Sequence, residues 1–96
     1  MRNIKNINDL TESELDALFL ARKTSITAFV PMTEECVVIT HEGSGHRIDD
    51  WKNYFIAFGA DGEAWPVHVD FFMKNYEELE LIEQQIKVKS FLTNSK

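Results

Sequence analysis

The amino-acid sequence predicts an α+β fold: an N-terminal helix, then a small, curled, mostly antiparallel β-sheet that is barrel-like, with a short helix after the last hairpin. Three observations support this prediction. A helix-capping motif stands at residues 10–15, short runs of alternating or β-branched residues follow it, and an Asp-Gly pair separates two apolar runs. The chain has 96 residues, which is typical of a single domain. We divide this domain into an N-terminal helical extension (1–21), a β-rich core (22–79) and a C-terminal strand or helix with its tail (80–96).

The N-terminal helix is predicted over residues 12–21. The stretch "LTESEL" contains a capping box, in which the Thr11 hydroxyl accepts from the Glu14 amide and the Glu14 carboxylate accepts from the Thr11 amide. Leu10 before the cap and Leu15 after the first turn have the spacing of a hydrophobic staple.

The middle of the chain predicts three strands. Apolar side chains alternate over residues 24–31, and Pro31 should end this strand because proline cannot donate to a ladder. The β-branched run at residues 35–40 predicts a second strand that is buried on both faces or nearly so. Two glycines within residues 41–45 predict a turn. A brief third strand at residues 46–48 then returns antiparallel to the second.

A hairpin is predicted next. Residues 54–59 form a strongly apolar strand, and Asp61-Gly62 is a signal for a tight turn between apolar runs. The return strand covers residues 63–67, with Pro66 placed at a sheet edge or a bulge.

The C-terminal third predicts one helix and an ambiguous tail. Asp70 is a candidate cap for a helix over residues 71–79. Three aromatic side chains are expected to lock this helix onto the sheet: Phe71, Phe72 and Tyr76. The segment 80–92 fits either a helix or a strand, and its Ile and Val content favours a strand at residues 86–91. Residues 93–96 are expected to fray.

The order of these elements carries a family resemblance. The matching pieces are Lys23 with Ile26 and Ala28, "VVITHEG" (37–43), "FIAFGADGEAWPV" (55–67) and "FFMKNYEEL" (71–79). Together they resemble the small PGDYG-type domain of phage-encoded proteins of unknown function, over about residues 22–79. The Gly-Asp-Tyr element itself is not kept, since Asn53-Tyr54-Phe55 stand in its place. The resemblance implies a compact β-rich module of phage origin and implies no activity.

Charge and composition limit the classes of partner. The net charge is −6, with 16 acidic and 10 basic residues, which argues against direct nucleic-acid binding and permits a basic protein partner. No apolar run approaches the roughly 20 residues of a membrane span, and residues 1–15 lack the apolar core of a signal peptide. We therefore expect a protein of the host cytoplasm with no membrane association, and the oligomeric state is left open. The single cysteine, Cys36, fits this compartment.

No complete catalytic or metal-ligating set is visible. The candidate metal ligands are His41, Glu42, His46, Asp49 and Asp50, around the glycine-rich turn. A closed metal site needs four firm ligands at defined spacing, so we interpret this segment as a solvated turn. Cys36 beside a β-branched run is interpreted as a small core residue rather than a nucleophile. We predict a protein that is not an enzyme and holds no metal or cofactor.

The predicted binding face is acidic and aromatic. It consists of Trp51, Asp49, Asp50, Glu77, Glu78 and Glu80. Trp51 stands in a polar stretch and is expected to be exposed as a hot spot, or else to cover the open end of a barrel. The favoured function is a small acidic phage accessory protein that binds and modulates a host protein, such as a defence or nucleic-acid-processing factor. The alternative is a small-molecule or nucleotide-binding module with a pocket near the loop at residues 41–50.

Overall fold

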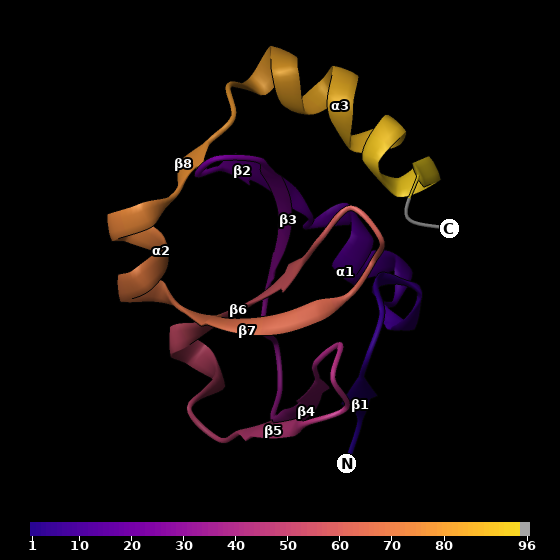
Figure 1. Ribbon diagram of the computed structural model, residues 1–96, viewed down its shortest axis with the longest axis vertical. Helices are drawn as coiled ribbons and strands as arrows, with labels where there is room; N and C mark the ends of the chain where they lie inside the picture. Colours follow the sequence, from indigo (N-terminus) through magenta and orange to yellow (C-terminus); the bar gives the residue numbers. More distant parts are fainter. Residues whose placement is uncertain (95–96) are drawn as a thin grey trace.

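The computed structural model describes residues 1–94 and places three α-helices around two β-sheets (Figure 1). The strands are β1 (Asn3–Ile4), β2 (Phe19–Arg22), β3 (Ile26–Pro31), β4 (Cys36–Ile39), β5 (Gly45–Ile48), β6 (Tyr54–Phe58), β7 (Ala64–His68) and β8 (Glu77–Glu78). The helices are α1 (Glu12–Asp16), α2 (Val69–Asn75) and α3 (Leu81–Asn94), with short 3₁₀ helices η1 (Ile7–Asp9) and η2 (Trp51–Asn53).

Both sheets are open. The smaller has the order β1-β4-β5 and the larger the order β7-β6-β3-β2-β8. All pairings are antiparallel except that of β1 with β4. In Figure 1 the smaller sheet lies below the larger one and α3 lies above it. The α+β class is confirmed, whereas the barrel-like closure is not, because neither sheet closes on itself.

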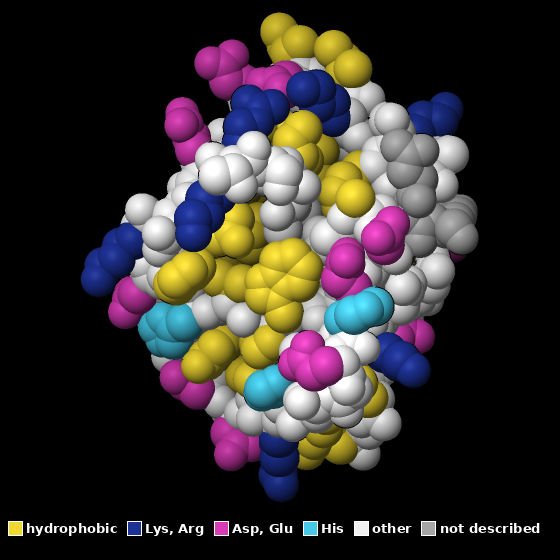
Figure 2. All heavy atoms as spheres, in the orientation of Figure 1, with side chains coloured by type: hydrophobic (Ala, Val, Ile, Leu, Met, Phe, Trp, Pro, Cys, Tyr) yellow, Lys and Arg dark blue, Asp and Glu magenta, His cyan; other side chains and the backbone are white. Residues whose placement is uncertain are grey.

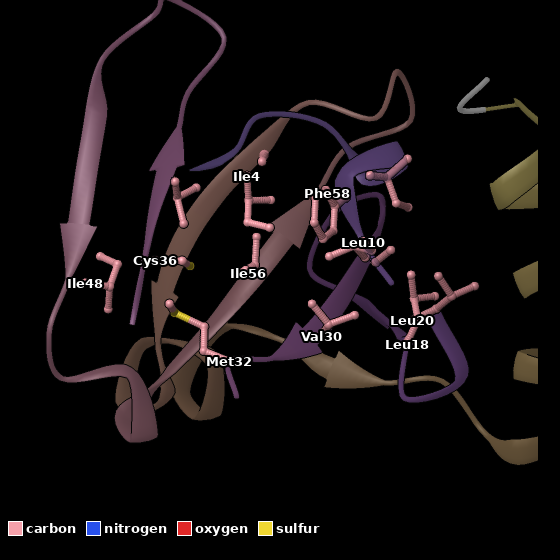
Figure 3. Close-up of a cluster of buried hydrophobic side chains, with 14 of the residues drawn as sticks. Ile4, Leu10, Leu18, Leu20, Val30, Met32, Cys36, Ile48, Ile56 and Phe58 are labelled. Carbon is pink, nitrogen blue, oxygen red and sulfur yellow. The ribbon is translucent and has the colours of Figure 1, made fainter. Parts of the chain in front are cut away.

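The larger core cluster fills the space between the two sheets. Ile4, Val38 and Ile48 from the smaller sheet belong to the same buried cluster as Ile56 and Phe58 of β6. Figure 3 shows Ile4 and Ile48 of the smaller sheet and Ile56 and Phe58 of the larger sheet within this cluster. Cys36 is buried in this cluster, which confirms its interpretation as a core residue.

A second, aromatic cluster covers the opposite face of the larger sheet. The ring of Phe29 lies 4.9 Å from that of Phe72 and 4.9 Å from that of Tyr76. Phe72 and Tyr76 therefore fasten α2 to the sheet as predicted. Phe71 is not part of the cluster: it is 49% exposed, and its ring lies only beside that of Tyr76, 6.3 Å between centres.

The first helix is shorter than predicted. Its capping box is confirmed, with the Glu14 amide donating to Thr11 Oγ1 at 3.2 Å and the Thr11 amide donating to Glu14 Oε1 at 2.8 Å. The prediction of a helix over residues 12–21 is wrong beyond α1, because Phe19–Arg22 forms β2 between β3 and β8. Leu20 and Ala21 are buried in opposite core clusters, as expected for successive residues of a strand with both faces covered.

The segment before this helix also joins the sheets, which the sequence did not indicate. β1 pairs in parallel with β4, and the Ile7 amide donates to the Gly62 carbonyl at 3.0 Å. The Arg2 guanidinium reaches the Glu14 carboxylate, with Nη1 donating to Oε2 at 2.9 Å.

The predicted hairpins are confirmed. β4 and β5 pair around a turn in which Gly43 has φ +93°, and β6 and β7 pair around a turn in which Gly62 has φ +84°. Pro66 lies on β7, an edge strand, and Pro31 is the last residue of β3.

The second helix begins earlier and ends earlier than predicted. Its cap is His68 rather than Asp70, because the imidazole Nδ1 accepts the hydrogen bond of the Asp70 amide at 3.0 Å. The helix stops at Asn75, and the predicted continuation to residue 79 is wrong. Residue 76 is already extended, so the chain turns into β8 and adds an edge strand to β2.

The tail forms a helix, so the strand predicted at residues 86–91 is wrong. On α3, Val88, Phe91 and Leu92 have the i, i+3, i+4 spacing of one helix face, and all three pack against the larger core cluster. Residues 93 and 94, predicted to fray, belong to α3, and residues 95–96 lie outside the described part of the chain. Within residues 1–94, no helix has the length and apolar character needed to cross a membrane.

Candidate functional site

The predicted binding residues fall into two separate groups. In the first, Asp49 lies 3.1 Å from Arg47 Nε, and Asp50 Oδ1 accepts from Asn53 Nδ2 at 2.8 Å. Trp51 is half-buried and packs against the larger core cluster. The ammonium group of Lys52 lies 5.5 Å from its ring centre. Trp51 is therefore partly a packing residue rather than a freely exposed side chain.

The second group lies on and just after β8. Glu77, Glu78 and Glu80 are exposed, and no ion pair among residues 1–94 engages them. They line a shallow hollow of about 210 Å³ together with Arg22 and Lys23. Within the described chain, no side-chain hydrogen bond or ion pair joins these glutamates to the first group.

The structure adds an exposed aliphatic face beside these glutamates. Leu81, Ile82 and Ile86 of α3 are 72%, 71% and 68% exposed. Ile82 and Ile86 are one helical turn apart, so their side chains adjoin. Figure 2 shows hydrophobic side chains projecting at the top of the molecule, where α3 lies in Figure 1.

An apolar hollow of about 540 Å³ continues this face toward the larger sheet. Leu81, Val88 and Leu92 line it from α3, and Leu18 and Phe19 line it from the residue before β2 and the first residue of β2. We name the combined area the β8–α3 surface; it comprises Glu77, Glu78, Glu80, Leu81, Ile82 and Ile86 with this hollow.

Polar contacts hold α3 in place below this surface. Glu83 accepts from Lys87 Nζ at 2.9 Å and from Arg22 Nη2 at 3.1 Å. These hydrogen bonds, that of Lys87 above all, hold the pKa of the Glu83 carboxyl below its ordinary value. Glu83 is thus engaged within the protein, which leaves Glu77, Glu78 and Glu80 as the acidic groups available to a partner.

The aliphatic face does not follow from the predicted secondary structure, because the Ile and Val content of the tail favours a strand at residues 86–91. On a helical projection of residues 81–94, the apolar side chains extend well past the face that packs on the sheet. This excess of apolar character around one helix is the signal that could have revealed the surface.

Within the described residues, neither the turn at residues 41–45 nor Cys36 belongs to a catalytic or metal-binding cluster. His41, Glu42 and His46 are exposed, and hydrogen bonding from the Thr40 hydroxyl lowers the pKa of Glu42. Burial raises the pKa of the Cys36 thiol, which disfavours the reactive thiolate. Among residues 1–94, no three His, Cys, Asp or Glu side chains converge as metal ligands.

Comparison with protein-family models, with curated proteins and with solved structures finds no match. The fold and site therefore define the chain as a small α+β protein with two open sheets and an acidic, aliphatic surface. The resemblance to PGDYG-type domains stays a prediction.

Proposed function

We propose that the protein is a non-enzymatic phage accessory protein that binds and modulates a host protein through the β8–α3 surface. The observation that carries this proposal is the exposure of Leu81, Ile82 and Ile86, each at least 68% accessible. Isolated exposed aliphatic side chains are common, but a contiguous apolar area on a small domain is typical of an interaction site.

Burial of this area would supply substantial binding energy. Covering an aliphatic side chain of this size stabilises a complex by about 1.5–3 kcal/mol before the costs of association are counted. The hollow beside Leu81 offers a place for an apolar side chain of the partner. The surface thus has the apolar centre that protein interfaces need.

The charge beside this centre indicates what kind of protein fits. Glu77, Glu78 and Glu80 flank the aliphatic residues, so the complementary partner carries an apolar patch bordered by Lys or Arg. A second copy of this chain, with its own net charge of −6, is a poorer match.

The host target is a defence or nucleic-acid-processing factor under this proposal. Such proteins carry basic surfaces because they must neutralise phosphates. The phage origin and the host cytoplasm as the place of action rest on the resemblance over residues 22–79.

The test combines capture with matched variants. The partner captured stoichiometrically from bacterial lysate is identified, purified and titrated against the wild-type chain and an Ile82→Ser/Ile86→Ser variant. The control is Met73→Ser, since Met73 on α2 is 73% exposed but lies outside the surface. We expect at least a tenfold loss of affinity for the double variant and no change for the control.

Equal loss of affinity in Met73→Ser would place the interface elsewhere. Light scattering of the purified chain distinguishes self-association. A dimer that the double variant converts to monomer would assign the same surface to a second copy and overturn the host-partner proposal.

A further inference from the structure

A larger hollow opens on another face, between the outer strands of the two sheets. It has a volume of about 850 Å³, within the range of roughly 300–1,000 Å³ that small-molecule sites occupy. We name it the β5–β7 groove; the residues that line it include Lys23, Arg47, Tyr54, Trp65, His68 and Tyr76. It does not overlap the β8–α3 surface, and only its β5 wall belongs to the loop at residues 41–50.

Aromatic side chains form much of this groove. Tyr54 of β6, Trp65 of β7 and Tyr76 after α2 line it, and all three are half-buried. The Trp65 ring packs against the aromatic cluster on one side, which fixes its position. Figure 2 shows a band of exposed hydrophobic side chains across the middle of this face, over β7, bordered by histidines. Such walls are suited to stacking on a planar ring.

The polar groups in the groove are cationic or neutral. Among the described residues that line it, Lys23 and Arg47 carry positive charge and none carries a carboxylate. Arg47 is already paired with Glu35 and Asp49, so Lys23 is the cation of the groove that favours a ligand with an anionic group.

The available donors are positioned by their neighbours. Arg47 is held by Glu35, 2.6 Å from its Nη2, and by Asp49. Lys23 makes no ion pair within residues 1–94, and its Nζ lies 5.6 Å from the centre of the Phe71 ring. Nδ1 of His68 accepts from the Asp70 amide, so the neutral imidazole carries its proton on Nε2 as a further donor.

The strand edges favour a small molecule over an added peptide strand. β5 and β7 are both outer strands, so each presents unpaired backbone groups. Pro66 removes one donor from the edge of β7, and the bridge between Asn6 and Glu63 already covers the start of that edge. An extended peptide would therefore find an interrupted ladder.

We propose that the β5–β7 groove binds a small planar aromatic anion, represented by a nucleoside monophosphate. The ring stacks among Tyr54, Trp65 and Tyr76, and the anionic group lies toward Lys23 with support from His68 and Arg47. The anion is a phosphate or a carboxylate, since both accept from the same donors.

The experiment uses Trp65 as its reporter. The chain has two tryptophans, so a Trp51→Phe background leaves Trp65 as the sole indole. Adenosine monophosphate, benzoate, adenosine and inorganic phosphate are titrated separately, and calorimetry on the unmodified chain repeats each titration. We expect saturable quenching by adenosine monophosphate and at least tenfold weaker binding of adenosine and of phosphate. Benzoate binding as tight as that of the nucleotide would support the aromatic anion and make carboxylates the better ligands.

Matched variants localise the binding. Lys23→Gln is expected to lower the affinity for adenosine monophosphate about tenfold, whereas Lys89→Gln on α3 should leave this affinity unchanged. Arg47→Gln should also lower the affinity for adenosine monophosphate, whereas Arg22→Gln, which lies outside the groove, should not. The proposal is overturned if none of the four compounds binds saturably, if adenosine or phosphate alone matches the nucleotide, or if the control variants weaken binding equally.

Discussion

The side-chain amide of Gln84 makes two hydrogen bonds with the backbone of a single residue, Leu20. The Leu20 amide donates to Gln84 Oε1 at 2.7 Å, and Gln84 Nε2 donates to the Leu20 carbonyl at 2.6 Å. The Leu79 amide also donates to that carbonyl, at 3.0 Å. A glutamine on α3 thus takes the place of a strand residue beside β2, just where the two-residue strand β8 ends.

Replacement of Gln84 by Leu should loosen α3. The Leu20 amide would lose its partner, and removing one partner of a buried hydrogen bond costs about 1–3 kcal/mol. Chemical denaturation measures the loss, and hydrogen exchange should show reduced protection of α3 amides. Gln85→Leu is the control because Gln85 is exposed. Unchanged protection of α3 in Gln84→Leu would show that apolar packing alone holds the helix.

The contact between Arg2 and Glu14, which links the N-terminal segment to α1, should contribute to the free energy of unfolding. Glu14 is buried and also closes the capping box, so Glu14→Gln removes a charge-assisted hydrogen bond worth about 1.5–3 kcal/mol. The exposed Glu12, in the same turn, gives the control Glu12→Gln. Equal free energies of unfolding for the two variants would contradict this role.

The same pair makes stability depend on pH in the acid range. The hydrogen bond from Arg2 is the main cause that lowers the pKa of Glu14 below its ordinary 4.5. A carboxyl with a lowered folded-state pKa contributes stability that is fully present above 4.5 and is lost as pH falls through the folded-state value. Denaturation at a series of pH values should show this loss in the wild type and a smaller one in Glu14→Gln.

Gly62→Val should destabilise the β6–β7 hairpin by about 1 kcal/mol or more. Gly62 has φ +84°, a conformation that a β-branched residue strongly resists. The control is Asp61→Val, which introduces the same side chain one position earlier. Asp61 does not have a positive φ, because among residues 1–94 only glycines do. A thermal midpoint for Gly62→Val no lower than that of Asp61→Val would argue against the importance of this conformation.

The glutamates of the β8–α3 surface should speed encounter with the partner. Association of the wild-type chain should slow as salt rises past about 0.1 M, where charges are screened beyond about 10 Å. The Glu77/Glu78/Glu80→Gln variant should associate more slowly at low salt and depend less on salt. Surface-based kinetics on the purified partner measures both effects. A wild-type association rate that does not change with salt concentration would show that these glutamates do not speed encounter.

Substitution of Trp51 tests whether the group formed by Asp49, Asp50 and Trp51 also contributes to the interface with the host protein. As a desolvated aromatic hot spot it would contribute about 2 kcal/mol or more to the complex, mainly through slower dissociation. If the interface extends to Trp51, the complex of Trp51→Ala should dissociate at least tenfold faster than that of the wild type, with Trp51→Phe intermediate. Because Trp51 also packs on the core, circular dichroism must first show that each variant is folded. Dissociation rates equal to wild type in folded variants would confine the interface to β8 and α3.

Local chemistry determined much of this fold from the sequence. In the capping box, the side chains of Thr11 and Glu14 each accept the hydrogen bond of the other residue's backbone amide. The motif therefore needs no contact with distant parts of the chain. Gly62 supplies a backbone conformation within one turn, and Pro31 cannot extend a ladder. These features depend on residues a few positions apart, so the sequence alone predicts them.

The acidic half of the candidate site was also predictable, since Glu77, Glu78 and Glu80 follow one another closely and such runs are normally exposed. Its aliphatic half was not, because exposure of Ile82 and Ile86 follows from how α3 docks. The β5–β7 groove was predicted only in part: the alternative function places a pocket near residues 41–50, and β5 does line the groove. Its other walls, which include Lys23 and Trp65, come from distant parts of the chain that only the tertiary structure brings together.

Tertiary structure decided the segments with ambiguous apolar patterns. Residues 19–22 are compatible with a helix, but β3 and β8 offer hydrogen bonds on both sides, and a strand there buries side chains on both faces. Residues 81–94 contain the Ile and Val of a strand, yet Gln84 reaches Leu20 only from a helix that begins just after β8. For short apolar segments, intrinsic preferences differ by less than about 1 kcal/mol per residue, so the partner that each segment meets selects its structure.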